Sequence, residues 1–229
     1  MKKIISNILS KVKSEKWELD SRIPTSYLLL FFFTKIVMLI RGWLKLLSVK
    51  HLIFVGANTK LYCKSLMHFN GTINIDRNCI INALSTEGII FGKNISIGKY
   101  TTIECSGTLR DIGKGLIVGN NVGLGTNGFF GCAGGIVIGK DTIFGNFVSM
   151  HSENHIFDNF ETPIRLQGVT RQGIVIGENC WIGAKATILD GANIGNGCIV
   201  AAGSVVTRGF YEENSIIGGV PARIIKKRA

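Results

Sequence analysis

An apolar residue followed by a small one recurs every six positions in the second half of the chain, and this period limits the possible folds more than any other feature. The longest run continues for six registers without a slip, at Ile176-Gly177, Ile182-Gly183, Ile188-Leu189, Ile194-Gly195, Val200-Ala201 and Val206-Thr207. On an α-helix, successive anchors would be rotated by about 240° and scattered around the surface. A coil that turns a corner every six residues places every anchor inside. The period therefore predicts an all-β, three-sided parallel solenoid with three hexads per coil.

The same spacing occurs in shorter blocks earlier in the chain, and the gaps between blocks predict inserted loops. Four residues after the anchors comes a second inward position, filled by Ile95, Thr101, Val122, Thr142, Val148, Cys180, Ala186, Ala192, Cys198 and Ser204. Because Asn and Gly relieve the backbone in tight turns, we expect corners at or near Asn94, Asn121, Asn146, Asn179 and Asn196. Stacked coils share one core, so the ends of the stack need caps. We assign residues 51–75 to one end and residues 208–229, finishing in a short helix over 224–228, to the other.

Composition removes several classes of protein. With 229 residues, 46% of them hydrophobic and 18% charged, the chain is neither intrinsically disordered nor a small disulfide-held domain. Its six cysteines form no CxxC pair and no repeated metal-ligand spacing, which argues against a metal site. Cys79, Cys180 and Cys198 occupy one fixed place in the repeat, so we expect them to act as small buried hydrophobic residues in a reducing compartment.

The net charge of +11 is concentrated at the two ends of the chain. Residues 1–50 carry ten Lys and Arg against three Asp and Glu, residues 223–229 add four basic residues, and the middle sums to zero. No zinc-finger spacing, RNP motif or basic stripe with interleaved aromatics accompanies these charges, so a nucleic-acid partner is not expected. Membrane phosphates or a phosphorylated small molecule fit the pattern better.

Residues 27–47 are apolar enough for a bilayer but are interrupted by basic side chains. On a helix, at 100° per residue, the polar residues form one narrow arc and leave a wide apolar face opposite it. The arc consists of Thr34, Arg41, Lys45 and Ser48. Lys35 lies off this arc. This pattern is typical of a helix that lies in a membrane interface rather than crossing it. The alternative is that the segment packs on the protein itself or at a subunit contact.

Two regions follow from these patterns. Residues 1–50 are predicted to form an amphipathic, membrane-associated helical region, and residues 51–229 the solenoid domain. The longest break in the period separates Phe144-Gly145 from Ile176-Gly177 and predicts an active-site loop over 151–173, since loops of this length are more often functional than structural. The loop holds His151 and His155, which can reach a ligand above a face of the solenoid, although composition alone equally allows solvent-exposed loop residues.

Several spaced motifs, taken in order, resemble those of the hexapeptide-repeat acyltransferases. They are Asn154-His155, Trp181-Ile182-Gly183, Ala201 to Thr207 and Gly219 to Lys226. The branch that they resemble most is that of the galactoside, maltose and nodulation sugar O-acetyltransferases and their capsule or O-antigen relatives. The resemblance covers about residues 90–228. It implies a left-handed parallel β-helix, a homotrimer and acetyl-CoA as co-substrate, without a metal.

The resemblance also implies roles for individual residues. It identifies His155 as the general base, with His151 in reserve, and Asn127 as an acceptor-binding residue, although Asn before Gly is also a common turn residue. The implied cofactor-binding residues are Trp181, Ala184, Ala202, Thr207, Arg208, Arg223, Lys226 and Lys227. Ala184 stands where some relatives carry Ser, so only backbone N–H groups remain there for an oxyanion. The basic tail is alternatively a solvated end.

Together these features predict an acetyl-CoA-dependent O-acetyltransferase that modifies a saccharide hydroxyl of a surface polysaccharide or a lipid-linked glycan intermediate. We expect it in the cytoplasm, peripherally on the inner face of the membrane. The alternatives are an N-acyltransferase on an amino sugar and a non-catalytic hexapeptide-repeat scaffold. A metal-binding scaffold would need three histidines at a subunit contact, and only His151 and His155 lie within the strong repeats.

Overall fold

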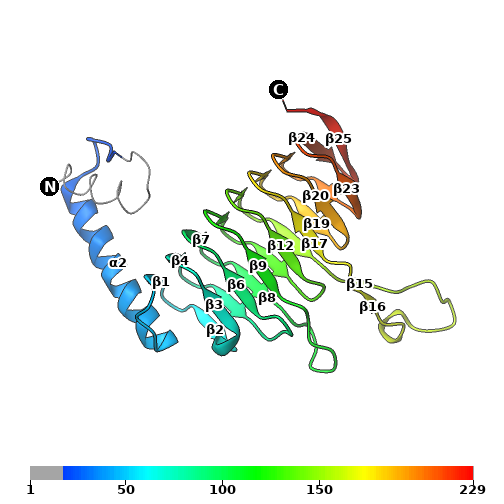
Figure 1. Cartoon of the computed structure of the whole chain (residues 1–229), viewed down its shortest axis with the longest axis horizontal. Coiled ribbons are helices and arrows are strands. Elements are labelled where there is room, and N and C mark those ends of the chain that lie inside the picture. The colour runs from blue at the N-terminus through cyan, green and yellow to red at the C-terminus, as the bar shows by residue number, and fades with distance from the viewer. Residues whose placement is uncertain (1–17, 229) are drawn as a thin grey trace.

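The protein is a stack of coils whose three sides are parallel β-sheets. The computed structural model describes residues 18–228, so the part of the 1–50 region before residue 18 lies outside the described residues. The chain visits the three sheets in a fixed order, and strands pair with those of the coils before and after. Figure 1 shows this stack running from β1 to β25. The all-β parallel solenoid predicted from the six-residue period is confirmed.

The strands are short, as the period requires. The first sheet contains β1 (Ile53–Val55), β4 (Ile73–Ile75), β7 (Ile95–Ile97), β10 (Gly123–Leu124), β13 (Ile143–Phe144), β18 (Trp181–Ile182), β21 (Ile199–Val200), β24 (Ser215–Gly219) and β25 (Ala222–Lys227). The second contains β2 (Lys60–Tyr62), β5 (Ile80–Asn82), β8 (Thr102–Glu104), β11 (Phe129–Gly131), β14 (Ser149–His151), β19 (Thr187–Leu189) and β22 (Val205–Val206). The third contains β3 (Met67–Phe69), β6 (Ile89–Phe91), β9 (Leu116–Val118), β12 (Ile136–Ile138), β17 (Ile174–Ile176), β20 (Ala192–Ile194) and β23 (Gly209–Tyr211).

The predicted inward positions form one continuous core. All ten residues at the second inward position, from Ile95 to Ser204, are buried, and so are the six anchors of the longest run. The expected corners are also present. Asn94, Asn121 and Asn179 adopt left-handed backbone conformations, and Asn94 Nδ2 donates to Asn121 Oδ1 of the next coil at 3.1 Å. The hexad pattern therefore specifies both what points inward and where the chain turns.

The three corners differ in composition. We call the turn from the first to the second sheet the first corner, that from the second to the third sheet the second corner, and that from the third to the first sheet the third corner. At the second corner the left-handed position is Cys63 in the first coil, and in the later coils it is glycine, at Gly88, Gly115, Gly135, Gly173, Gly191 and Gly209. A Cβ on Gly115 would lie 2.2 Å from the Gly88 carbonyl oxygen, so the coils that carry these two glycines stack too closely at this point for a side chain.

Helix α2 (Thr25–Leu46) closes the N-terminal end of the stack and packs on β1. A Cβ on Gly42 would lie 1.9 Å from the Ile53 carbonyl oxygen, which shows how directly the two elements meet. Residues 51–75, which we expected to be a cap, instead form the first coil. The pairing of Ile53 with Ile73 makes this coil 20 residues long, and it includes the 3-10 turn η1 (Lys64–Leu66), so its hexad period is hidden.

The C-terminal end also corrects a prediction. Residues 224–228 do not form a helix, because Ala222–Lys227 is the strand β25, antiparallel to β24. β24 belongs to the last coil of the first sheet, where its outer edge would leave N–H and C=O groups unpaired. Pairing with β25 satisfies that edge. Ala222 is buried, whereas the basic side chains of β25 are exposed.

Candidate active site

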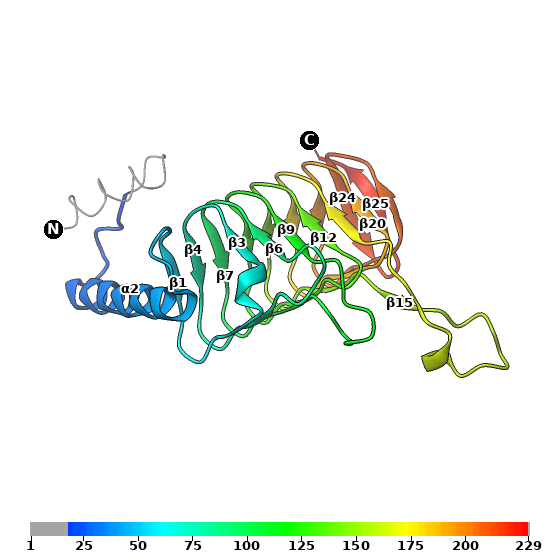
Figure 2. The same cartoon turned by 60° about the horizontal axis from the view of Figure 1, so that its bottom comes forward.

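The expected active-site loop leaves the solenoid at the second corner, between β14 and β17. Its two arms pair as β15 (Asn154–His155) and β16 (Val169–Thr170), with His155 opposite Val169. Figure 2 shows the loop reaching well away from the coils beyond β15. His155 is exposed on this hairpin, so its imidazole is open to a ligand or to another subunit. In the described chain, no hydrogen bond joins His155 to Asp158, which sequence analysis leaves open as its partner.

His151 lies four residues earlier, on β14 of the second sheet. Its Nε2 is 2.6 Å from Ser149 Oγ, and its ring centroid is 5.4 Å from that of Phe129 on the adjacent strand. Desolvation lowers the pKa of His151, so the neutral ring is favoured. Both histidines therefore belong to the root of one loop, but His151 already has partners on the sheet surface while His155 projects from the hairpin.

An ion-paired arginine ties the base of this loop to a second loop. Arg171 follows β16, and its Nε is 2.7 Å from Glu153 Oε2 while its Nη1 is 2.8 Å from Asp111 Oδ2. Asp111 belongs to the insertion between β8 and β9, which leaves the same corner. The Arg171 side chain is only 19% exposed. We call this group of Arg171, Glu153 and Asp111 the loop clasp.

A buried carboxylate fixes the point where the loop rejoins the solenoid. Asp190, at the second corner after β19, is 3% exposed. Its Oδ1 accepts the backbone N–H of Gln172 at 2.9 Å and that of Gly173 at 2.8 Å. Such charge-assisted hydrogen bonds fix the backbone directly before β17. Sequence analysis missed both Asp190 and the clasp.

The residues implied by the resemblance fall on different parts of the coil. Asn127, Ala184 and Ala202 lie along the first corner, and Trp181 is half-exposed on the outside of the first sheet. Asn127 has the left-handed backbone of a corner residue, with φ of 56°, and its Nδ2 donates to Thr126 Oγ1. Within one chain, this row and His155 lie at opposite ends of the second-sheet strands.

The remaining implied cofactor residues divide into two groups. Thr207 and Arg208 follow β22 at the second corner, on the same side of the solenoid as the loop. Arg223, Lys226 and Lys227 lie on β25, at the far end of the sheet that carries Trp181. Lys227 Nζ is 2.7 Å from Glu212 Oε2, which lowers the pKa of the Glu212 carboxyl through that hydrogen bond. Arg223 and Lys226 are exposed.

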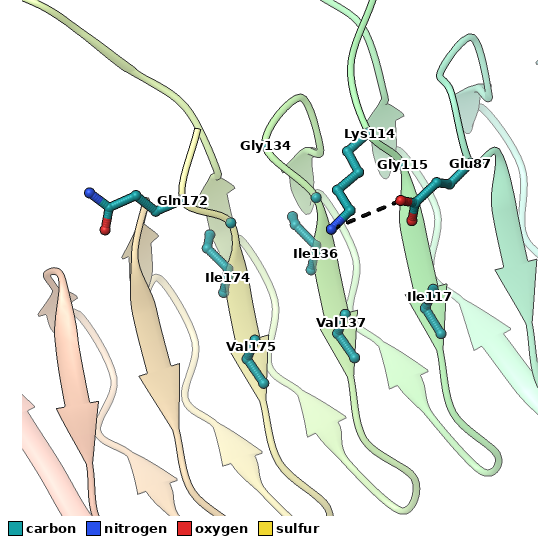
Figure 3. Close-up of a pocket in the computed structure, with 12 residues that line it drawn as sticks. Glu87, Lys114, Gly115, Ile117, Gly134, Ile136, Val137, Gln172, Ile174 and Val175 are labelled. Carbon is teal, nitrogen blue, oxygen red and sulfur yellow. Dashed lines mark ion pairs between the residues drawn. The ribbon is translucent and has the colours of Figure 1, made fainter. Parts of the chain in front are cut away.

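A small hollow lies on the outside of the third sheet beside the loop root (Figure 3). Its volume is about 120 Å³, and its floor is the outward row of Ile117, Val137 and Val175. Lys114 and Glu87, with Nζ and Oε1 3.9 Å apart, border one side. The hollow opens along the glycine row of the second corner, so backbone as well as side chains is accessible to a ligand there.

The cysteines behave as core residues. Cys63 is exposed, and the other five are buried without disulfides. Burial raises the pKa of the Cys79 thiol to about 11, so it stays protonated at neutral pH. Among residues 18–228, no group of three or more His, Cys, Asp or Glu side chains is arranged to hold a metal ion.

Comparison with known proteins agrees with this architecture. The family described as Bacterial transferase hexapeptide (six repeats) matches residues 173–208. The chain is 32% identical over 164 residues to WbbJ of Escherichia coli K12, provisionally named a lipopolysaccharide biosynthesis O-acetyl transferase, covering 66% of this chain and 80% of WbbJ. It is 30% identical to the provisionally named acetyltransferase SACOL2570 of Staphylococcus aureus, covering 83% and 89%. The similarity to the provisionally named acetyltransferase Rv3034c of Mycobacterium tuberculosis, at 31% identity, covers 62% of this chain but 51% of that protein.

Solved structures share the fold. A variant of AntD, an N-acyltransferase from Bacillus cereus in complex with dTDP and coenzyme A, has a TM-score of 0.55 at 17% identity, covering 76% of this chain and 85% of AntD. AntD in complex with dTDP and 3-hydroxybutyryl-CoA has a TM-score of 0.53 at 18% identity, covering 79% and 81%. From its repeats and from the extent of its similarity to WbbJ and SACOL2570, the chain belongs to the hexapeptide-repeat acetyltransferase family.

Proposed function

We propose that this protein transfers the acetyl group of acetyl-CoA to a hydroxyl of a saccharide in surface-polysaccharide or lipid-linked glycan synthesis, with His155 as the general base. The observation that carries the proposal is the exposed His155 on a clasped hairpin of a hexapeptide-repeat chain. The loop is long, its base is fixed by ion pairs, and it displays an imidazole that the solenoid itself does not use. WbbJ, by its name, acts in lipopolysaccharide biosynthesis.

The chemistry needs one base and one electrostatic site. The neutral imidazole of His155 takes the proton from the sugar hydroxyl as that oxygen bonds to the thioester carbonyl carbon. Backbone N–H groups stabilise the resulting oxyanion, since Ala184 offers no hydroxyl. When the tetrahedral species collapses, the C–S bond breaks and the imidazolium returns its proton to the departing CoA thiolate. No acyl-enzyme forms.

The cofactor residues suggest how acetyl-CoA lies on the surface. The small residues Ala184 and Ala202 leave room for an extended pantetheine arm along the first corner, next to Trp181. Arg223 and Lys226 on β25 offer cations to the CoA phosphates at the end of the same sheet. Because these residues and His155 lie at different corners of one chain, we assign the complete site to the contact between neighbouring subunits of a homotrimer.

We place the enzyme on the inner face of the cytoplasmic membrane. The support is α2, a 22-residue helix that is long and apolar enough, by length and composition, to cross a membrane, with only 17% of its most apolar window buried. It follows a basic segment that anionic lipids attract. At this leaflet the active site meets both cytoplasmic acetyl-CoA and a membrane-bound acceptor.

The test is a transfer assay with the full chain. Purified protein is incubated with acetyl-CoA and a panel of glycans, and free CoA thiol is measured. We expect release that depends on a hydroxyl acceptor and falls about 10²- to 10⁴-fold in His155→Ala, the usual effect of losing a general base. His151→Ala is the matched control. A wild-type rate in His155→Ala together with a loss in His151→Ala would move the base to His151.

The N-acyltransferase alternative is distinguished in the same assay. Each hydroxyl acceptor is paired with the amino sugar that carries an amine at the same carbon, and the products are treated with mild alkali. Esters are hydrolysed under these conditions and amides are not. An alkali-stable product formed only from amino sugars would replace the proposed reaction by N-acylation, and no CoA release with any acceptor would favour a scaffold.

A further inference from the structure

Helix α2 turns two of its three cations, Lys35 and Arg41, toward the solenoid rather than toward solvent. Arg41 Nη1 donates to the Val55 carbonyl oxygen at 2.8 Å, and Lys35 Nζ donates to Asn74 Oδ1 on β4. Together with Gly42 against Ile53, these contacts attach the helix to the first coil. Both cations therefore lie on the solenoid side of the helix. If the opposite side of the helix entered a lipid bilayer, the two cations would stay outside the lipid. A bilayer-spanning position would break all of these contacts.

The opposite side of the helix is apolar and uncovered by any described residue. Five of its exposed apolar residues recur every three or four residues and share an arc of about 80°. They are Leu29, Phe33, Ile36, Ile40 and Leu44, with exposed fractions of 60%, 65%, 57%, 47% and 71%. We call them the outer face of α2. A continuous apolar face of this kind marks an interaction site.

Charge on the same end of the molecule indicates a lipid partner. Between residues 48 and 82, the first coil and its turns carry Lys50, Lys60, Lys64 and Arg77 against the single acid Asp76, and all four cations are exposed. A groove of about 350 Å³ beside the helix combines Leu30 and Phe33 with Arg77. Apolar side chains beside exposed cations suit acyl chains below anionic headgroups.

The helix lies across the end of the stack (Figure 1). If its outer face inserts into a bilayer, the solenoid axis is therefore upright, that is, directed away from the bilayer surface. The active-site loop leaves after β14, four strands along the second sheet from β2. At about 4.8 Å per strand this is about 19 Å above the first coil. β24 is seven strands from β1, or about 34 Å. His155 is therefore held well away from the headgroups.

We propose that the outer face of α2 docks on an anionic lipid surface with the solenoid axis upright, and that the acceptor is consequently a lipid-linked oligosaccharide rather than a lipid bearing one sugar. The second part rests on the proposed function. A hydroxyl on the first sugar lies at the bilayer surface, below the reach of the hairpin, whereas a sugar several residues along the glycan extends to it. The helix thus selects which sugar is modified.

Energy transfer to labelled lipid headgroups measures the orientation without any activity. Native Cys63, exposed in the first coil while the other cysteines are buried, takes one label. Two Cys63→Ser variants take it at Phe160→Cys on the loop and at Val220→Cys between β24 and β25, both exposed positions. On phosphatidylcholine vesicles containing phosphatidylglycerol, we expect transfer to decrease in the order Cys63, Phe160, Val220. Equal transfer at all three would overturn the upright orientation.

A sedimentation assay tests the docking surface. We expect Phe33→Ser with Ile40→Ser to lose vesicle binding at least tenfold, and the matched pair Leu109→Ser with Phe210→Ser, exposed elsewhere, to keep it. If the wild-type chain ignores vesicles and the α2 pair instead changes its oligomeric state by light scattering, the outer face is a contact between copies and the proposal fails.

The acceptor is tested on the same vesicles. Lipid-linked glycans with one sugar and with several are compared with the corresponding delipidated glycans. We expect the longer lipid-linked acceptor to be acetylated at least tenfold faster than the shorter, and the two delipidated glycans to react at similar rates. Equal rates on the two lipid-linked acceptors would overturn the oligosaccharide assignment. No reaction with any of the four acceptors would contradict the proposed function while leaving the measured orientation intact.

Discussion

Arg171 connects two loops through a single guanidinium, and its effect on catalysis is predicted to be one of position. Arg171→Ala leaves Glu153 and Asp111 without their shared cation. The root of the hairpin that carries His155 is then no longer held in place. A displacement of about 1 Å at a catalytic group can reduce a rate about 10²-fold. We expect kcat to fall about ten- to a hundred-fold, with little change in the KM for acetyl-CoA, measured by CoA release.

Two variants control this prediction. Arg165→Ala removes an exposed arginine from the same loop and should leave kcat unchanged. Arg171→Lys should recover only part of the rate, because an ammonium cannot reproduce the planar fork that meets both carboxylates. An unchanged kcat in Arg171→Ala accompanied by a lower melting temperature would make the clasp purely structural.

At the same residue scale, the sequence predicts the histidine loop but not its supports. The break in a regular period is visible along the chain, so His151 and His155 can be found from it. Arg171 and Asp111 are 60 residues apart, and they meet only because both insertions leave the same corner. Asp190 occupies a turn position like many others, and its two backbone hydrogen bonds depend on where a remote loop returns.

Among the secondary-structure elements, β25 shows why the C-terminal prediction was wrong. Residues 224–228 resemble a short helix in isolation, with two apolar residues followed by basic ones. The open edge of β24 decides the outcome, because pairing it with an antiparallel strand satisfies backbone groups that a helix would leave unpaired. For α2 as well, the sequence alone leaves the direction of a side chain open. Helical periodicity gives the polar arc, but only the carbonyl of Val55 shows that Arg41 faces the solenoid.

The strand also changes how a phosphate role for the tail is tested. Deleting residues 223–229 would remove most of β25, so substitution is preferable. We expect Arg223→Gln with Lys226→Gln to weaken CoA binding about tenfold at low salt, as measured by calorimetry, and the difference to disappear near 1 M salt, where the Debye length is about 3 Å. Lys227 is left in place because it pairs with Glu212.

The matched control for this element is a pair of exposed lysines at the third corner. Lys93→Gln with Lys140→Gln removes the same formal charge from a distant part of the surface. It should leave CoA affinity within about twofold of wild type, since surface charges more than about 10 Å away are screened at ordinary ionic strength. If both pairs weaken binding equally, net charge and not β25 explains the affinity.

For the whole molecule, the separation of site residues over two corners leads to a prediction about assembly. His155 projects from the second corner, whereas Ala202 and Ala184 lie along the first, so one chain alone does not bring them together. His155→Ala lacks the proposed base, and Ala202→Trp fills the surface along which the pantetheine arm is proposed to lie. Each variant alone, assembled as the proposed homotrimer, is expected to be inactive. Mixed at equal amounts during refolding or coexpression, they should recover about one quarter of wild-type activity, because in a ring of head-to-tail contacts random assortment gives one intact site in four.

Mixing wild type with the double variant supplies the reference for assortment. Inactivity of the mixture, with mixed trimers demonstrated by mass, would place the complete active site within one chain.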